Sequence, residues 1–485
     1  IAVDDAALEK FYGEKPELDK YKIYITEIRR GREHSLSPEL EKLLAGTNEL
    51  ADLPYEGFAT LGNADLKFPE ITNEKGEKIQ ITNGRFVPLE ESKDRRVRKE
   101  VFEKYYETFG SFKNTWATLY AGQVKQLMFY ARARKYSSTL EAAVDGNNVS
   151  PEVYKNLVEA VNDNLDKMHR YVRLRKKLLE LDELHMYDVY VPIVKDYDVK
   201  YTIEEAKELV LKAVEPLGTN YVNLIKKAFA ERWIDVVENE GKRNGAYSSG
   251  VYGVHPFVLL NFNGTLDNVF TLAHEMGHAM HSYFSNEAQN YLDSRYKIFV
   301  AEVASTTNEV LLMEYMLKNA KDNKERAYLL NHYMDSFKGT VFRQTMFAEF
   351  EKTSNEMAEA GEPLTHENLT ELYLNLNKKY YGEAMISDDL IGYEWMRIPH
   401  FYYNFYVYQY ATGFSAAVAI ANRVLKEGET VKVKVTGIKD GKISLSKKAL
   451  EENVEPKDPS KGFKYVEKGV ASTSLAGLLK DIKLD

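Results

Sequence analysis

The 485-residue sequence contains no cysteine, so it can form no disulfide bond and can offer no thiolate to a metal ion. It also lacks any apolar run that approaches the ~20 residues of a membrane-spanning helix, and no signal peptide is visible. An excess of positive charge is missing too, since the formal net charge is −9. These absences argue against a disulfide-stapled, membrane-embedded or nucleic-acid-binding body and favour a cytoplasmic protein.

What the sequence does contain is helical periodicity over most of its length. Hydrophobic residues make up 44% of the chain, enough for a sizeable core, and they recur at intervals of three and four. We therefore expect a mainly α-helical fold. Helices are expected within residues 1–50, 93–145, 150–181, 203–241 and 325–380. Short strands are expected within residues 68–90, where the period changes, and within residues 245–264, which glycines punctuate.

The most informative motif is the H-E-x-x-H pattern of residues 274–278, inside an apolar stretch that is expected to be helical. Histidines four apart on a helix share one face, so His274 and His278 can each give a nitrogen to one metal ion. Glu275 stands beside them, placed to take a proton from water that the metal activates. The alternative is a chance match, at roughly one in a hundred for a chain of this length. The motif predicts one zinc ion with Glu275 as the general base.

A zinc enzyme of this kind needs a third protein ligand and an open fourth position, and Glu302 is the candidate for that ligand. It lies 24 residues after His278, a gap that would span about 36 Å on one straight helix. Glu302 must therefore come from a second helix that folds back after the polar connection at residues 286–294. A solvated helical glutamate is the alternative, but the apolar neighbours Phe299 and Val303 favour burial against a cation.

Glu309 is a candidate for support of the metal ligands. It follows Glu302 by seven residues, so the two carboxylates share a helical face. From that face Glu309 can accept a hydrogen bond from a ligand imidazole and fix its tautomer. A plain salt bridge is the alternative.

The glycine-rich residues 245–264 are expected to form a small β element just before the metal helix. A peptide substrate can add to the edge of such an element as an extra strand. Its candidate substrate contacts are Gly250, Tyr252, Gly253 and His255. The alternative is a structural hairpin, in which His255, because it precedes Pro256, only shapes the turn.

Four stretches carry a resemblance to a known family. They read GAYSSGVYGVHPFVLLN (245–261), HEMGHAMHSYFS (274–285), FVAEVASTTNE (299–309) and RIPHFYYNFYVYQYATG (397–413). Over roughly residues 20–423 the sequence resembles the oligoendopeptidase F branch of the thimet-oligopeptidase-like (M3) zinc metallopeptidases. The resemblance implies a two-lobed helical body with a deep channel, zinc at its floor, and oligopeptide substrates. Because that family carries more chain upstream, the amino-terminal lobe is expected to be truncated.

The aromatic run near residue 400 contains a second candidate cluster. His400, Tyr403, Tyr406 and Tyr410 follow one another at spacings of three, three and four, which places them on one face if the segment is a single helix. An aromatic packing stripe is the alternative, but four polar tips are costly to bury unpaired. The resemblance implies that His400 and one of these tyrosines donate to the oxyanion that develops on the substrate. Which tyrosine donates is left open.

After about Arg423 the pattern changes. Residues 430–438 alternate strictly, Asp440-Gly441 is typical of a hairpin turn, and residues 443–445 form the answering strand. This piece resembles part of an S1 RNA-binding domain. From residue 426 to the end the chain carries 13 lysines against 10 acidic residues, so any nucleic-acid contact is expected through this tail.

The sequence therefore predicts a zinc-dependent endopeptidase that hydrolyses internal bonds of short unstructured oligopeptides. The expected organisation is a helical lobe over residues 1–235, a zinc catalytic lobe over residues 236–423 and an atypical tail over residues 424–485. A zinc exopeptidase is the rival among enzymes. An RNA-associated binding protein with an inactive peptidase-like body is the rival from another class.

Overall fold

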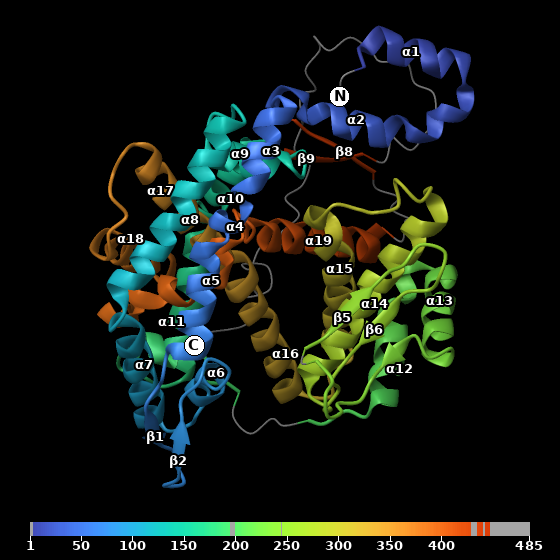
Figure 1. The fold of residues 1–485 in the computed structure, drawn as a ribbon. Coiled ribbons are helices and arrows are strands. Elements are labelled where there is room, and N and C mark those ends of the chain that lie inside the picture. Colours follow the sequence, from blue (N-terminus) through green and yellow to red (C-terminus); the bar gives the residue numbers. More distant parts are fainter. Residues whose placement is uncertain (1–2, 195–198, 244, 428–433, 440–441, 447–485) are drawn as a thin grey trace.

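The fold of the computed structural model is mainly helical, as the sequence predicts. The structure describes residues 3–194, 199–243, 245–427, 434–439 and 442–446. Two groups of elements lie on either side of α16 (Asn323–Ser336), and α19 (Tyr408–Glu427) runs across the middle of the view and packs against both (Figure 1). The group that concerns function contains α12 to α15 together with a small sheet.

The α-helices that precede α16 are joined partly by short connections and partly by longer ones that contain the short strands. In chain order they are α1 (Asp5–Glu14), α2 (Lys22–Arg30), α3 (Pro38–Gly46), α4 (Asn48–Ala51), α5 (Leu53–Thr60), α6 (Phe86–Glu90), α7 (Arg95–Gly110), α8 (Lys113–Ala133), α9 (Thr139–Asp145), α10 (Pro151–Asn162), α11 (Leu165–Leu178), α12 (Ile203–Ala213), α13 (Thr219–Ala230), α14 (Leu266–Ala288) and α15 (Ile298–Lys318). After α16 come η6 (Phe337–Arg343), α17 (Gln344–Glu359), α18 (His366–Tyr381), η8 (Pro399–Tyr402) and α19.

Helix α10 begins where the sequence predicts but ends early. Ser150 caps it by accepting a hydrogen bond from the Glu152 backbone N–H, with Pro151 in the first turn. The single helix expected over residues 150–181 is in fact two helices, α10 and α11. The break falls at Asn164, whose side-chain amide donates to the Ala160 carbonyl at 2.9 Å and so satisfies a helix-end acceptor.

The region of residues 68–90 contains one hairpin and one short helix. Strands β1 (Glu70–Thr72) and β2 (Lys78–Gln80) pair antiparallel, which confirms the expected strands. Phe86 was expected among the strands and instead begins α6. Its backbone N–H donates to the Thr82 carbonyl at 3.0 Å, which closes a helical turn rather than a ladder. Burial of the Phe86 ring, 1% exposed, stabilises that turn against the core.

Helices α14 and α15 pack against each other with their backbones in contact. A Cβ atom added to Gly277 would lie 2.5 Å from the Cα of Ser305 and 2.8 Å from the carbonyl oxygen of Ala304. A second tie lies one turn away, where the side-chain amide of Asn308 donates to the Ala273 carbonyl at 3.1 Å. Glycine at position 277 therefore sets the separation of the two helices.

We expect Gly277→Ala to destabilise the protein. Alanine favours a helix locally by up to about 1 kcal/mol, but its methyl group collides with backbone atoms, and overpacking of this kind costs roughly 1–3 kcal/mol. The measurement is urea or thermal unfolding. Gly13→Ala is the matched control, because Gly13 lies in α1 with nothing within 4 Å of the added atom. A Gly277→Ala variant as stable as Gly13→Ala would contradict the close approach.

The small β element next to α14 is present, as predicted. It is a three-stranded sheet in the order β4 (Ile234–Asp235), β6 (Phe257–Leu259), β5 (Tyr247–Ser249), with β5 at the edge. Strand β6 pairs parallel with β4 and antiparallel with β5. The other two-stranded pair in the helical body joins β3 (Leu184–His185) to β7 (Met385–Ile386).

The residues between His400 and Tyr410 do not lie on one helix, so the single-face prediction is wrong. The short 3-10 helix η8 ends at Tyr402, and α19 begins only at Tyr408. Between them Asn404 and Phe405 have φ values of 55° and 56°. Right-handed helices contain no such residues, so the spacing of three and four loses its meaning there.

The two strands of the expected hairpin near the carboxyl end are present. Strands β8 (Lys434–Lys439) and β9 (Lys442–Ser446) pair antiparallel. The turn at Asp440-Gly441 and most of the predicted tail lie outside the described residues, so the S1 resemblance stays a prediction. Among the helices that the structure describes, none combines the length and apolar character of a membrane span.

Candidate active site

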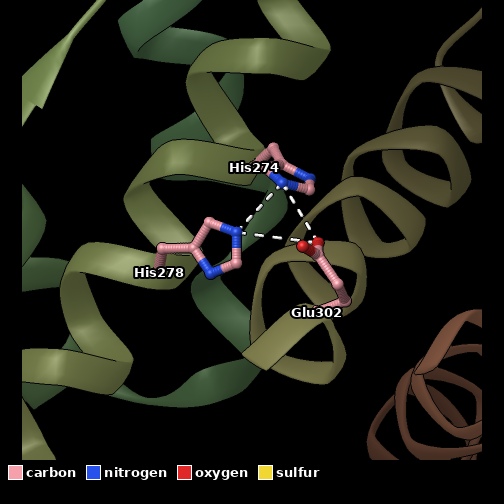
Figure 2. Close-up of side chains that lie close together, drawn as sticks. All are labelled: His274, His278 and Glu302. Atoms are coloured by element: carbon pink, nitrogen blue, oxygen red, sulfur yellow. Dashed lines mark hydrogen bonds and ion pairs between the residues drawn. The ribbon is translucent and has the colours of Figure 1, made fainter. Parts of the chain in front are cut away.

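His274, His278 and Glu302 meet where α14 and α15 face each other (Figure 2). His274 and His278 lie one turn apart on α14, and their Nε2 atoms are 3.1 Å apart. Glu302 belongs to α15, and its Oε2 atom lies 3.3 Å from the Nε2 of His274 and 3.6 Å from that of His278. The second helix thus folds back onto the first, as the 24-residue gap requires.

These three side chains fit a metal ion. Ligand atoms bound at ~2.0–2.1 Å to a tetrahedral zinc ion stand about 3.3 Å apart, and the three observed separations of 3.1, 3.3 and 3.6 Å bracket that value. Two imidazoles and one carboxylate are also the donor set of catalytic zinc sites that keep one position open. No other group of this kind occurs within the described residues.

Hydrogen bonds behind the imidazoles orient both rings. The Nδ1 atom of His274 lies 2.6 Å from Glu309 Oε1, and the ring of His278 is hydrogen-bonded to the backbone of Ala301. Burial disfavours protonation of His274, but the carboxylates of Glu309 and Glu302 prevail and raise its pKa to about 9. Burial and the charge of His274 lower the pKa of His278.

Glu302 is held from two sides. The Oγ of Ser305 donates to Glu302 Oε2 at 3.2 Å, and a Cβ added to Gly413 of α19 would lie 3.2 Å from the Cβ of Glu302. Nothing in the sequence singles out Ser305 by itself. Its spacing of three from Glu302, which puts both on one helical face, is the signal that identifies it.

Glu275 is buried against the edge of the small sheet. Its side chain is 6% exposed, and the backbone of Ser248 in β5 is hydrogen-bonded to its carboxylate. The second oxygen, Oε2, has no hydrogen-bond partner among the described residues. Burial raises the pKa of Glu275 to about 7, the range in which a general base works best near neutral pH.

His400, Tyr406 and Tyr410 come together although they lie on different elements. The Oη of Tyr410 is 3.4 Å from the Nε2 of His400, and the rings of Tyr406 and Tyr410 are 5.4 Å apart. Burial, with a contribution from the charge of Glu302, raises the pKa of both tyrosines, so both keep their proton at neutral pH. Both hydroxyls are therefore available as donors on the side of the metal ligands.

Tyr403 lies at the margin of this cluster. Its ring centroid is 5.4 Å from that of His400, but the side chain is 43% exposed and its hydroxyl lies 3.4 Å from that of Tyr55 in α5. This position is better suited to contact with a ligand than to donation to an oxyanion beside the metal ligands.

The four residues predicted to contact substrate spread along the loop between β5 and β6. Gly250 packs against α14, where an added Cβ would lie 2.8 Å from the Cβ of Ser282. Tyr252 is 41% exposed and donates to the Gln289 carbonyl at 3.2 Å. Gly253 has a φ of 83°, which allows the loop to turn.

His255 is stacked on Trp233, with ring centroids 4.7 Å apart and planes 6° apart. Its Nδ1 atom also lies 2.8 Å from the Pro256 carbonyl oxygen. These contacts favour the turn-shaping alternative for His255. Contacts of Gly250, Tyr252, Gly253 and His255 with a substrate remain predictions.

The helical fold and the two-histidine, one-glutamate cluster define the H-E-x-x-H metallopeptidase class. Residues 88–447 match the family model described as Peptidase family M3, and residues 1–68 match the model described as Oligopeptidase F. The chain belongs to peptidase family M3. The match continues past Arg423, where the change of pattern was expected.

Individual relatives agree with this assignment. The chain is 52% identical over 429 residues to oligopeptidase PepF of Bacillus subtilis, covering 88% of this chain and 64% of the relative. It is 46% identical over 425 residues to the group B oligopeptidase PepB of Streptococcus agalactiae, covering 88% and 70%. A crystal structure of oligoendopeptidase-F from Enterococcus faecium matches with 43% identity and a TM-score of 0.72, covering 88% and 71%. The chain thus spans about two thirds of the length of these relatives.

Proposed function

We propose that the protein is a zinc-dependent endopeptidase that hydrolyses internal bonds of short, unstructured oligopeptides. The observation that carries the proposal is the convergence of His274, His278 and Glu302 beside the buried carboxylate of Glu275. The names of the relatives, oligopeptidase and oligoendopeptidase, support the substrate class. A cytoplasmic location and a deep channel that admits flexible peptides stay predictions.

The residues present assign a set of roles. A zinc ion held by His274, His278 and Glu302 would supply Lewis acidity, which polarises a carbonyl group and acidifies water. Glu275 takes a proton from the attacking water through its unpartnered oxygen and returns it to the leaving amine. Glu309 keeps the His274 ring in the tautomer whose Nε2 faces inward.

Two further elements act on the substrate. Strand β5 is the edge of its sheet and lies against α14 at Glu275. A peptide paired along that edge would be held by its backbone, which makes few demands on the substrate sequence and places a scissile bond next to the base. His400, with Tyr406 or Tyr410, donates to the oxyanion that develops on the carbonyl.

The test is metal content measured together with cleavage of a peptide that is blocked at both ends and internally quenched. We expect about one zinc ion per chain, cleavage of an internal bond, loss of activity with chelator and recovery with zinc. Cleavage only of peptides with free ends would support the rival zinc exopeptidase. A zinc-loaded protein that cleaves neither kind of peptide would overturn the proposal.

Among the tyrosines, Tyr410→Phe is expected to slow the enzyme without inactivating it. Its hydroxyl is the one within reach of His400, and loss of one oxyanion donor typically lowers kcat by roughly 10²–10³-fold. Steady-state kinetics on the quenched peptide gives the measurement. Tyr408→Phe is the matched control, since the Tyr408 ring packs against Tyr154 and Phe299, neither of which belongs to the cluster. Equal losses in both variants would argue for a packing role.

A further inference from the structure

The turn that joins η8 to α19 adopts a left-handed conformation that asparagine tolerates but phenylalanine does not favour. Asn404 and Phe405 are consecutive, neither is glycine, and both have positive φ. A side chain in this left-handed region is crowded by the backbone, and two in a row persist only where the surroundings impose them. Something outside the turn must therefore hold it.

The surroundings that hold the turn belong to α17. The backbone N–H of Phe405 donates to Glu351 Oε1 at 2.7 Å, and Glu351 is 1% exposed. The Phe405 ring packs against Tyr154 at 5.6 Å, and the Tyr154 hydroxyl donates to the Ala348 carbonyl, one turn before Glu351. The turn is thus fixed to α17 at two points, one polar and one aromatic.

Glu351 is costly to keep in this position. Its second oxygen, Oε2, has no hydrogen-bond partner among the described residues. Burial raises its pKa to about 8, which shows that the site disfavours the charged form. A leucine of similar volume would be cheaper to bury. None of the roles proposed above for the metal ligands, the base or the oxyanion donors uses this carboxyl group.

The turn connects two tyrosines of the cluster near His400. Tyr403 precedes the two left-handed residues and is tied to η8, because its backbone N–H donates to the His400 carbonyl at 2.9 Å. Tyr406 follows them, and its backbone carbonyl accepts a hydrogen bond from the Gln409 backbone N–H at 3.3 Å, at the start of α19. The direction of the chain at residues 404 and 405 therefore decides how Tyr403 and Tyr406 stand relative to His400.

We infer that Glu351 is a positioning residue: by accepting the Phe405 N–H it locks the left-handed turn that sets Tyr403 and Tyr406 against His400. The inference rests on the proposed function for its catalytic consequence. Its structural part, the locking of the turn, stands independently. Glu351 touches no reacting atom and acts only through the backbone of the turn.

Two substitutions separate the acceptor from the volume that Glu351 fills. Glu351→Gln keeps an oxygen that can accept the Phe405 N–H, whereas Glu351→Leu keeps similar volume and removes the acceptor. We expect Glu351→Gln to behave like the wild type. For Glu351→Leu we expect a kcat at least about tenfold lower, because small misplacements of catalytic groups cost up to about 10²-fold. KM should change by less than about threefold, and bound zinc should stay at one per chain.

Hydrogen exchange followed by mass spectrometry measures the stability of the turn independently of enzymatic activity. Glu351→Leu should speed exchange in the peptide that covers residues 401–407 by about tenfold, the usual worth of one hydrogen bond. Glu351→Gln should leave that rate unchanged. If the wild type cleaves no peptide, this readout still tests the lock, so failure of the proposed function and failure of the inference are distinguishable.

Three further variants complete the design. Glu349→Leu, on the same helix, removes a carboxylate that binds Lys379, Tyr380 and Asn162, none of which belongs to the turn, and it should leave kcat and the exchange of residues 401–407 unchanged. Adding Asn404→Gly to Glu351→Leu should restore part of kcat, because glycine adopts positive φ without strain. Where Glu351→Leu fails to fold, Glu351→Asp, whose shorter side chain withdraws the acceptor, should show the same two effects in smaller measure.

The inference is overturned if Glu351→Leu keeps wild-type kcat and exchange. It is also overturned if Glu349→Leu matches the loss, or if activity falls only in proportion to bound zinc, because either result indicates a general structural role.

Discussion

Glu275→Gln is expected to abolish most turnover while leaving zinc bound. Glutamine has the same shape and still accepts the hydrogen bond from Ser248, but it cannot take a proton. General-base catalysis typically contributes about 10²–10⁴-fold, so kcat should fall by that factor with little change in KM. Because Glu275 gives no ligand atom to the His274, His278 and Glu302 group, zinc content should stay at one per chain.

The control for this variant lies on the same helix. Glu287→Gln makes the same change at an exposed position twelve residues further along α14 and should leave kcat unchanged. Steady-state kinetics and metal analysis of both variants are the measurements. Near-full activity in Glu275→Gln would show that another group accepts the proton of the attacking water.

Glu302→Ala is expected to lose zinc and activity together. The variant leaves two imidazoles without the carboxylate that completes the ligand set. Glu309→Gln, which alters only the partner of His274, should weaken zinc binding by about 10–100-fold. The loss of zinc affinity in Glu302→Ala should exceed the loss in Glu309→Gln. Competition with a chelator of known affinity measures the zinc affinity of each variant.

Glu314→Gln provides the comparison on α15, because this half-buried carboxyl group lies twelve residues from Glu302 and outside the ligand set. Its zinc affinity should equal that of the wild type. Undiminished zinc binding in Glu302→Ala would remove the carboxylate from the proposed site and leave the third ligand unassigned.

The metal cluster was predictable because its signals are local and strict. Two histidines four apart need only a helix to share a face, and the helix was evident from the apolar run around the motif. In the structure this helix begins after Thr265, whose side chain caps α14. Glu302 required one more step. The gap after His278 was too long for one helix, so the chain had to fold back, and the structure places the carboxylate accordingly.

The geometry around His400 was not predictable in the same way. Counting residues works only while the backbone repeats, and the repeat is interrupted at Asn404 and Phe405. No glycine or proline marks that interruption, because the force that imposes it comes from Glu351, which is more than fifty residues distant in the sequence. A carboxylate among Phe347, Ala348 and Phe350 on an otherwise apolar face was the one hint.

The backbone contact at Gly277 bears on which ions the protein accepts. The separation of α14 and α15 is set by Gly277 rather than by the ion. We therefore expect folding to bring the three ligand side chains together before any metal binds. Divalent ions of similar radius should then enter the same three ligands without rearrangement. Cobalt(II) bound in this way would give the colourless protein a visible absorption spectrum that reports the coordination geometry of the metal ion.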